Sequence, residues 1–171
     1  MSNPTKSVKN VGIFSLIISI FFLAITIACV VFIIGIHNAI KNEDSIAVIF
    51  LIILAIVIYF VLGIVGLVSL VLSILNLSTG IIILKNSNSY DKLYQKKGRI
   101  KFSIFILAFT SFVFFIAGVG LIFSLFSEFT VASVIIAVIM IALGCISFIL
   151  SKKAHDAFKE IIEAKEAESI N

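Results

Sequence analysis

The sequence has little charge for its length. Only 13% of its 171 residues are charged, 61% are hydrophobic, and the mean hydropathy is +1.28. Soluble domains average about 25% charged and about 45–50% apolar residues. The composition therefore excludes an ordinary water-soluble domain and predicts a membrane protein.

Ionisable side chains are absent from the four long apolar runs of the sequence. These runs cover residues 11–36, 46–84, 102–126 and 131–150. Ion-coupled transporters and voltage sensors usually carry charged residues at membrane depth, so the sequence disfavours these classes. Proline, which often interrupts transporter helices, occurs once, at Pro4.

Catalytic and metal-binding motifs are also missing. The sequence has no H-E-x-x-H, Walker or G-x-S-x-G motif, and no Cys/His spacing typical of a metal site. We therefore expect a protein that is not an enzyme and that binds no metal, cofactor or nucleic acid.

Cysteine occurs twice, at Cys29 and Cys145. In the expected arrangement their heights in the membrane differ by about 20 Å, well beyond the ~7 Å limit between the Cα atoms of a disulfide. We expect both to be small apolar core residues. Residues 26–29 weakly resemble a bacterial lipoprotein box, but an apolar stretch follows Cys29 where a polar tether is usual. Lipidation of Cys29 remains a disfavoured alternative.

The apolar runs predict the fold. A membrane span needs about 20 apolar residues, so residues 11–36, 102–126 and 131–150 are each expected to cross once. Residues 46–84, if fully helical, would reach roughly 60 Å, about twice the thickness of the hydrocarbon core. We predict an all-α, integral membrane four-helix transmembrane bundle with a cytoplasmic C-terminal helical extension.

The long second run has an alternative interpretation. As one span it must tilt strongly, project beyond the bilayer, or break near Gly63 and Gly66. As two spans it would give five crossings in all. Five crossings would place Lys6 and Lys9 outside the cell if the basic segment 85–101 stays inside, which fits the charge distribution less well.

The charged connections set the expected orientation. Cations gather before the first run, in residues 85–101 and after the fourth run. The first connection instead has Lys41 against Glu43 and Asp44, and the third has Glu128 and no cation. Because basic connections stay in the cytoplasm, both termini are predicted to be cytoplasmic. The expected regions are a cytoplasmic N-terminus at 1–10, a four-span domain at 11–150 and a charged helical tail at 151–171.

The amino-acid bias suggests the source. The chain has 35 isoleucines, 17 phenylalanines, and 12 lysines against one arginine. Ile, Phe and Lys use A/T-rich codons, so we expect the plasma membrane of a bacterium with an A/T-rich genome.

Small residues recur at positions i, i+3 and i+7 in three of the runs. Such residues share one helical face, which lets another helix approach closely in lipid. We expect the polar Asn76 to find a partner at Thr110 or Ser111. The predicted helix-packing residues are Gly12, Ser15, Ser19, Gly66, Ser69, Ser73, Asn76, Gly80, Gly144 and Ser147.

The segment after the second run is basic and contains two tyrosines. Cations near an anionic leaflet each add about 1 kcal/mol of attraction, although topology alone also explains their position. The predicted contacts with anionic lipid headgroups are Lys85, Lys92, Lys96, Lys97, Arg99 and Lys101.

The C-terminal tail has an apolar stripe that needs a covering surface. Ala154, Phe158 and Ile161 follow helical spacing, and Lys159 is placed to pair with Glu163. We expect the tail to pack on residues 90–94 or on a partner, with a solvated, fraying helix as the alternative.

The expected function is that of a non-enzymatic scaffold or accessory subunit. It would assemble with itself or with another membrane protein through the Gly/Ser faces. The alternative is a small transporter or pore-forming component acting as an oligomer.

Overall fold

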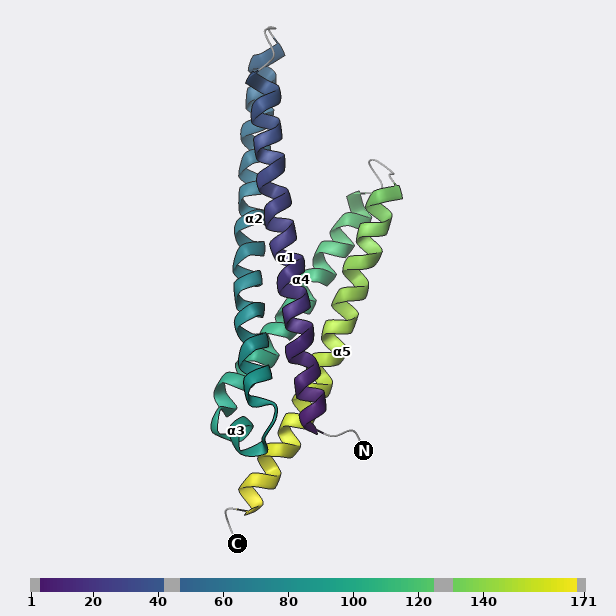
Figure 1. Cartoon of the computed structure of the whole chain (residues 1–171). Coiled ribbons are helices and arrows are strands. Elements are labelled where there is room, and N and C mark those ends of the chain that lie inside the picture. The colour runs from purple at the N-terminus through teal and green to yellow at the C-terminus, as the bar shows by residue number, and fades with distance from the viewer. Residues whose placement is uncertain (1–3, 42–46, 125–130, 169–171) are drawn as a thin grey trace. The chain divides into compact units, whose positions relative to one another are not determined.

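The computed structural model describes residues 4–41, 47–124 and 131–168, and all the regular structure in these ranges is helical (Figure 1). Four of the helices are long and apolar enough to cross a membrane. The connections that contain Glu43, Asp44 and Glu128 lie outside the described residues. The helices are α1 (Pro4–Lys41), α2 (Ala47–Asn86), α3 (Tyr90–Gln95), α4 (Lys97–Ser124) and α5 (Val131–Glu168).

Helix α2 resolves the question raised by the second apolar run. It is one continuous helix of 40 residues that passes through Gly63 and Gly66 without a break. The two-span alternative requires an interruption at these glycines, so the structure does not support five crossings. At 1.5 Å per residue, α2 is roughly 60 Å long.

Helix α1 is longer than its apolar run. It contains 38 residues, beginning before Lys6 and ending at Lys41, and so includes polar residues at both ends. A helix can continue through polar residues because its hydrogen bonds join backbone groups within the helix and do not depend on the polarity of the side chains.

The chain divides into two compact units. The first unit contains residues 1–16 and 76–171, and the second contains residues 17–75. The second unit is an antiparallel pair formed by the C-terminal part of α1 and most of α2. Its contacts are described below with the candidate site.

In the first unit, α4 and α5 pack closely at two glycines. A Cβ on Gly144 would lie 3.2 Å from the carbonyl oxygen of Ser111, and one on Gly118 would lie 2.6 Å from the side chain of Ile141. Phe114, which is fully buried, fills space next to Gly144. The two glycines thus permit backbone contact, and a large aromatic side chain packs beside it.

Helix α5 continues without interruption from its apolar part into the charged tail. Phe158 and Ile161 of the tail are buried, and Leu93 of α3 is fully buried. Helix α3 contacts α5, and the Lys165 ammonium lies 2.7 Å from the Asp91 carboxylate. The prediction that the tail packs on the 90–94 segment is confirmed, as is the Lys159–Glu163 ion pair, at 3.6 Å.

Candidate functional site

The predicted helix-packing residues are covered by the chain's own helices. Gly12 and Gly80, both in the first unit, lie where α1 and α2 cross. A Cβ on Gly80 would come within 2.9 Å of the Gly12 carbonyl oxygen and 2.7 Å of Leu16. Ser15 is also fully buried, and its hydroxyl has no hydrogen-bond partner among the described residues.

In the second unit, hydroxyl groups join α1 to α2. The Ser73 hydroxyl donates to the Ser19 carbonyl oxygen at 2.9 Å and lies 3.3 Å from the Ser19 hydroxyl. Ser69 and Thr26 form a second pair, with their hydroxyl oxygens 2.9 Å apart. These contacts lie on the face that the sequence predicted, although Thr26 was not among the predicted packing residues.

Gly66 allows close approach in the same unit. A Cβ placed on it would lie 3.4 Å from the Cβ of Cys29. Cys29 is buried, as expected, and neither cysteine forms a disulfide. The prediction that Cys145 is also a buried core residue is wrong, because it lies on an exposed side of α5. The sequence indicates how far along the helix Cys145 lies, but it does not indicate which way the side chain points.

Asn76 connects two helices of the first unit. Its side-chain amide donates a hydrogen bond to the Thr110 hydroxyl of α4 at 3.1 Å, and both residues are fully buried. Thr110 in turn donates to the carbonyl oxygen of Ile106, one turn earlier in α4. The predicted Asn76–Thr110 contact is confirmed. Ser111, the other candidate partner, donates to Leu107.

On α5, Gly144 and Ser147 are buried. Ser147 donates to the carbonyl oxygen of Leu143 in its own helix rather than across to a neighbour. The small residues of this face therefore provide space for α4 more than hydrogen bonds to it.

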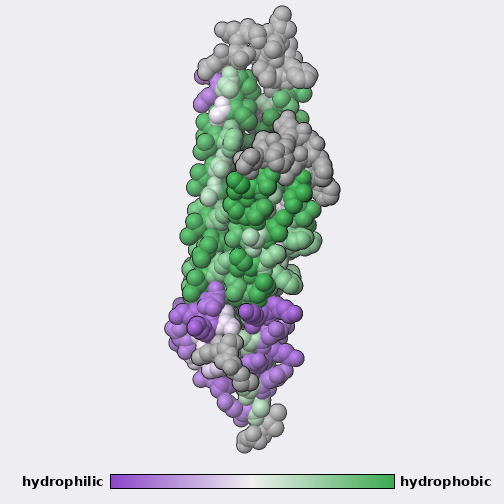
Figure 2. All heavy atoms as spheres, turned by 90° about the vertical axis from the view of Figure 1, so that its right-hand side faces the viewer, coloured by the Kyte–Doolittle hydropathy of each residue, from purple (hydrophilic) through white to green (hydrophobic). Residues whose placement is uncertain are grey.

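The predicted lipid-contacting cations are all exposed. In the first unit, hydrophilic side chains gather at the end formed by the start of α1, by α3 and by the tail of α5 (Figure 2). Lys97 is partly engaged there, because its ammonium lies 3.8 Å from the Glu166 carboxylate and 4.9 Å from the centre of the Tyr94 ring.

Lys165 has the strongest electrostatic contacts at this end. Its ammonium lies 2.7 Å from the Asp91 carboxylate and donates a hydrogen bond to Glu168, also at 2.7 Å. These two carboxylates raise the pKa of Lys165 above its ordinary value. The lysine therefore stays protonated to a higher pH than an ordinary lysine does.

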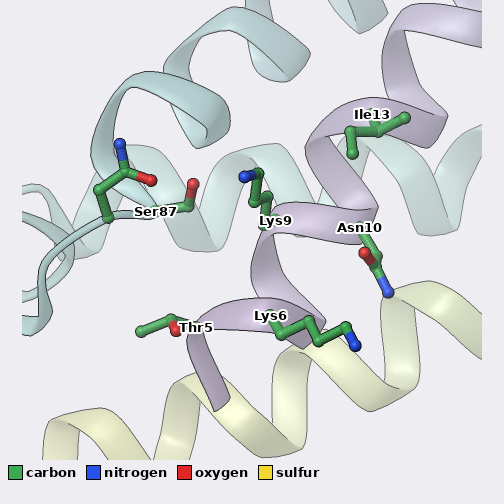
Figure 3. A pocket seen from close by; sticks show the side chains of 7 residues that line it. Thr5, Lys6, Lys9, Asn10, Ile13 and Ser87 are labelled. Carbon is green, nitrogen blue, oxygen red and sulfur yellow. The ribbon is translucent and has the colours of Figure 1, made fainter. Parts of the chain in front are cut away.

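A pocket lined mainly by polar and charged residues opens at the start of α1, within the first unit. It has a volume of about 570 Å³ and is lined by Thr5, Lys6, Lys9, Asn10, Ile13, Ser87 and Asn88. In Figure 3, Lys9 extends from α1 toward Ser87. From the sequence, Lys6 and Lys9 were predicted only to set the topology and Asn88 only to lie in a polar turn, and nothing predicted that they would line one pocket. The sequence signal for this pocket was weak, because it consists only of polar residues at the ends of two apolar runs.

A second pocket, of about 300 Å³, lies between α4 and α5. Its lining is almost wholly apolar and includes Phe112, Phe115, Phe148 and the exposed Cys145.

No protein-family model, curated protein or solved structure matches this chain.

Proposed function

We propose that this chain is a non-enzymatic scaffold or accessory subunit of a bacterial plasma membrane, crossing it four times with both termini in the cytoplasm. Four helices long and apolar enough to span a bilayer support the membrane location. The bacterial source is proposed from the high content of Ile, Phe and Lys, residues that A/T-rich codons encode.

The charge distribution supports the orientation. Cations precede the first apolar run at Lys6 and Lys9, fill residues 85–101, and follow the fourth run at Lys152 and Lys153. Under the positive-inside rule, these three regions belong on the cytoplasmic side. The α5 tail and α3, which contact each other, would then form a small cytoplasmic platform.

The scaffold proposal rests on where the polar and small residues lie. Ser19, Ser73 and Asn76 are buried against other helices of the same chain, as are Gly12 and Gly80. These residues are engaged within the chain and so are not available to line a path for a solute. Association through the Gly/Ser faces would require the helices to separate, so a partner should meet a different face.

The outer face of α2 is the surface that we propose for such a partner. It is opposite the Ser69 and Ser73 side, and its members are exposed and apolar. They follow helical spacing along the central part of the helix. The outer face of α2 consists of Ile53, Val57, Phe60, Ile64, Leu67 and Val71.

Association in native membranes tests the scaffold proposal. The double variant Phe60→Ala/Leu67→Ala shortens two prominent side chains, 70% and 66% exposed, without adding polarity. We expect chemical crosslinking of the wild type to capture a defined complex, and the variant to lose most of it. Phe105→Ala on α4, 62% exposed, is the matched control and should keep the complex. Equal crosslinking of all three would contradict the proposal.

Solute flux separates the scaffold from the transporter alternative. Liposomes that contain only this protein should show no selective flux above that of protein-free liposomes. Selective flux that Asn76→Leu abolishes and Gly63→Ala preserves would establish the pore or transporter function instead. Gly63 is a suitable control because a Cβ added there meets no atom within 4 Å.

A further inference from the structure

We infer that the pocket at the start of α1 binds the phosphate of an anionic phospholipid headgroup. Ser87 and Asn88 of the segment 85–101 line this pocket, but none of that segment's cations do. The inference rests on the membrane location proposed above, but it does not depend on the scaffold role.

The pocket has the size and the hydrogen-bond donors for a phosphate diester with a small alcohol. Ligand sites commonly measure about 300–1,000 Å³, and this pocket measures about 570 Å³. Two ammonium groups, from Lys6 and Lys9, supply charge, and the Asn10 and Asn88 amides supply neutral donors. Lysine ammonium and amide N–H groups are both suitable donors to phosphate oxygens.

The pocket lysines are available for an external anion. The pocket lining contains no carboxylate, and neither Lys6 nor Lys9 forms an ion pair with any carboxylate in the described part of the chain. Both lysines are exposed, so their flexible stems can turn toward a bound group. Lys165, by contrast, already contacts two carboxylates.

The position of the pocket favours a lipid over a soluble phosphate. Its lining passes from Lys9 to Ile13, which lies within the first apolar run and is 44% exposed. A headgroup bound by the lysines would therefore place its acyl chains beside apolar side chains. A free phosphate ion would gain nothing from this apolar side of the pocket.

The test measures lipid retained by the full-length protein. The chain is reconstituted into nanodiscs of neutral phosphatidylcholine mixed with anionic phosphatidylglycerol, then transferred to detergent, and bound lipid is counted by native mass spectrometry. We expect the wild type to retain phosphatidylglycerol selectively. Lys6→Gln/Lys9→Gln should reduce this retention about tenfold, because each cation contributes to the attraction for an anionic headgroup.

Three further variants make the result specific. Lys6→Arg/Lys9→Arg keeps the charge and should keep the lipid. Asn88→Asp leaves α1 untouched but adds a carboxylate to the pocket, and should also reduce retention. Lys152→Gln/Lys153→Gln removes the same charge from exposed positions outside the pocket and should retain the lipid. The inference requires this whole pattern, and any other pattern overturns it.

Soluble probes distinguish the two sources of phosphate. Inorganic phosphate and glycerol phosphate, each added to the wild type, should leave the retained lipid in place. Displacement of the lipid by either probe would assign the pocket to a soluble phosphate and overturn the lipid inference. A chain that fails to insert into the nanodiscs would instead contradict the membrane proposal.

Discussion

Asn76 of α2 donates a hydrogen bond to Thr110 of α4 across 3.1 Å, and both side chains are fully buried. In an apolar setting an amide without such a partner is costly, so the two residues fix how these helices meet. A double-mutant cycle with Asn76→Ala and Thr110→Val should give a coupling free energy of about 0.6 kcal/mol, and not above roughly 2 kcal/mol.

Reversible unfolding in mixed detergent would measure this coupling. Ser111→Ala replaces Thr110→Val in the control cycle, since Ser111 bonds to its own helix. A control coupling as large as that of the Asn76–Thr110 pair would show that the hydrogen bond has no specific role.

Gly80 is predicted to tolerate no side chain. Gly80→Ala would bring a Cβ within 2.9 Å of the Gly12 carbonyl oxygen, which is backbone and can move only if α1 shifts. We expect a loss of about 1–3 kcal/mol in the free energy of unfolding. Gly63→Ala meets no atom within 4 Å and should be neutral or slightly stabilising, because alanine favours the helix. Equal stability of the two variants would refute this account of the α1–α2 crossing.

The Lys165–Asp91 contact is predicted to hold α3 against the tail. Asp91→Asn removes one of the two carboxylates that the ammonium contacts, so amide hydrogen exchange in α3 should become faster. Asp156→Asn is the control, since Asp156 is exposed and forms no ion pair in the described residues. The charge swap Asp91→Lys/Lys165→Glu should restore part of the protection. Fast exchange in the control alone would contradict the prediction.

The pH dependence of this contact follows from the raised pKa of Lys165. A raised pKa in the folded state means that the contact contributes its full stability below the ordinary lysine value of 10.5 and loses it as the pH rises further. We therefore expect the far-ultraviolet circular dichroism difference between wild type and Asp91→Asn to stay constant from neutral pH to about 10, then to shrink. A difference that disappears below pH 9 would contradict the assignment.

The proposed orientation places the connections at 42–46 and 125–130 on one side of the membrane and residues 85–101 on the other. In a chain with Cys29 and Cys145 replaced by alanine, single cysteines are introduced by Ser45→Cys, Ser89→Cys and Ser127→Cys. A membrane-impermeant maleimide applied to intact cells should label the first and third and spare the second. Labelling of the Ser89→Cys protein from outside would overturn the proposed topology.

The sequence alone determined the features that depend on local composition. Apolar runs without charge predicted four helices long enough to cross a membrane, and small residues at i, i+3 and i+7 predicted the packing faces. The Asn76–Thr110 contact was also predictable, because few polar groups occur at comparable depth in the apolar runs. These features follow from the high cost of placing unsatisfied polar groups in an apolar environment.

Only the tertiary structure decided the features that depend on the direction of side chains and the approach of distant segments. Helix continuity through Gly63 and Gly66 could not be read from the sequence, since glycine both permits and weakens a helix. The sequence also misplaced Cys145 and gave no reason to connect Lys9 with Asn88, because a periodic pattern does not specify which residues of another helix lie opposite. Packing between helices sets that register, and it brings the polar pocket together.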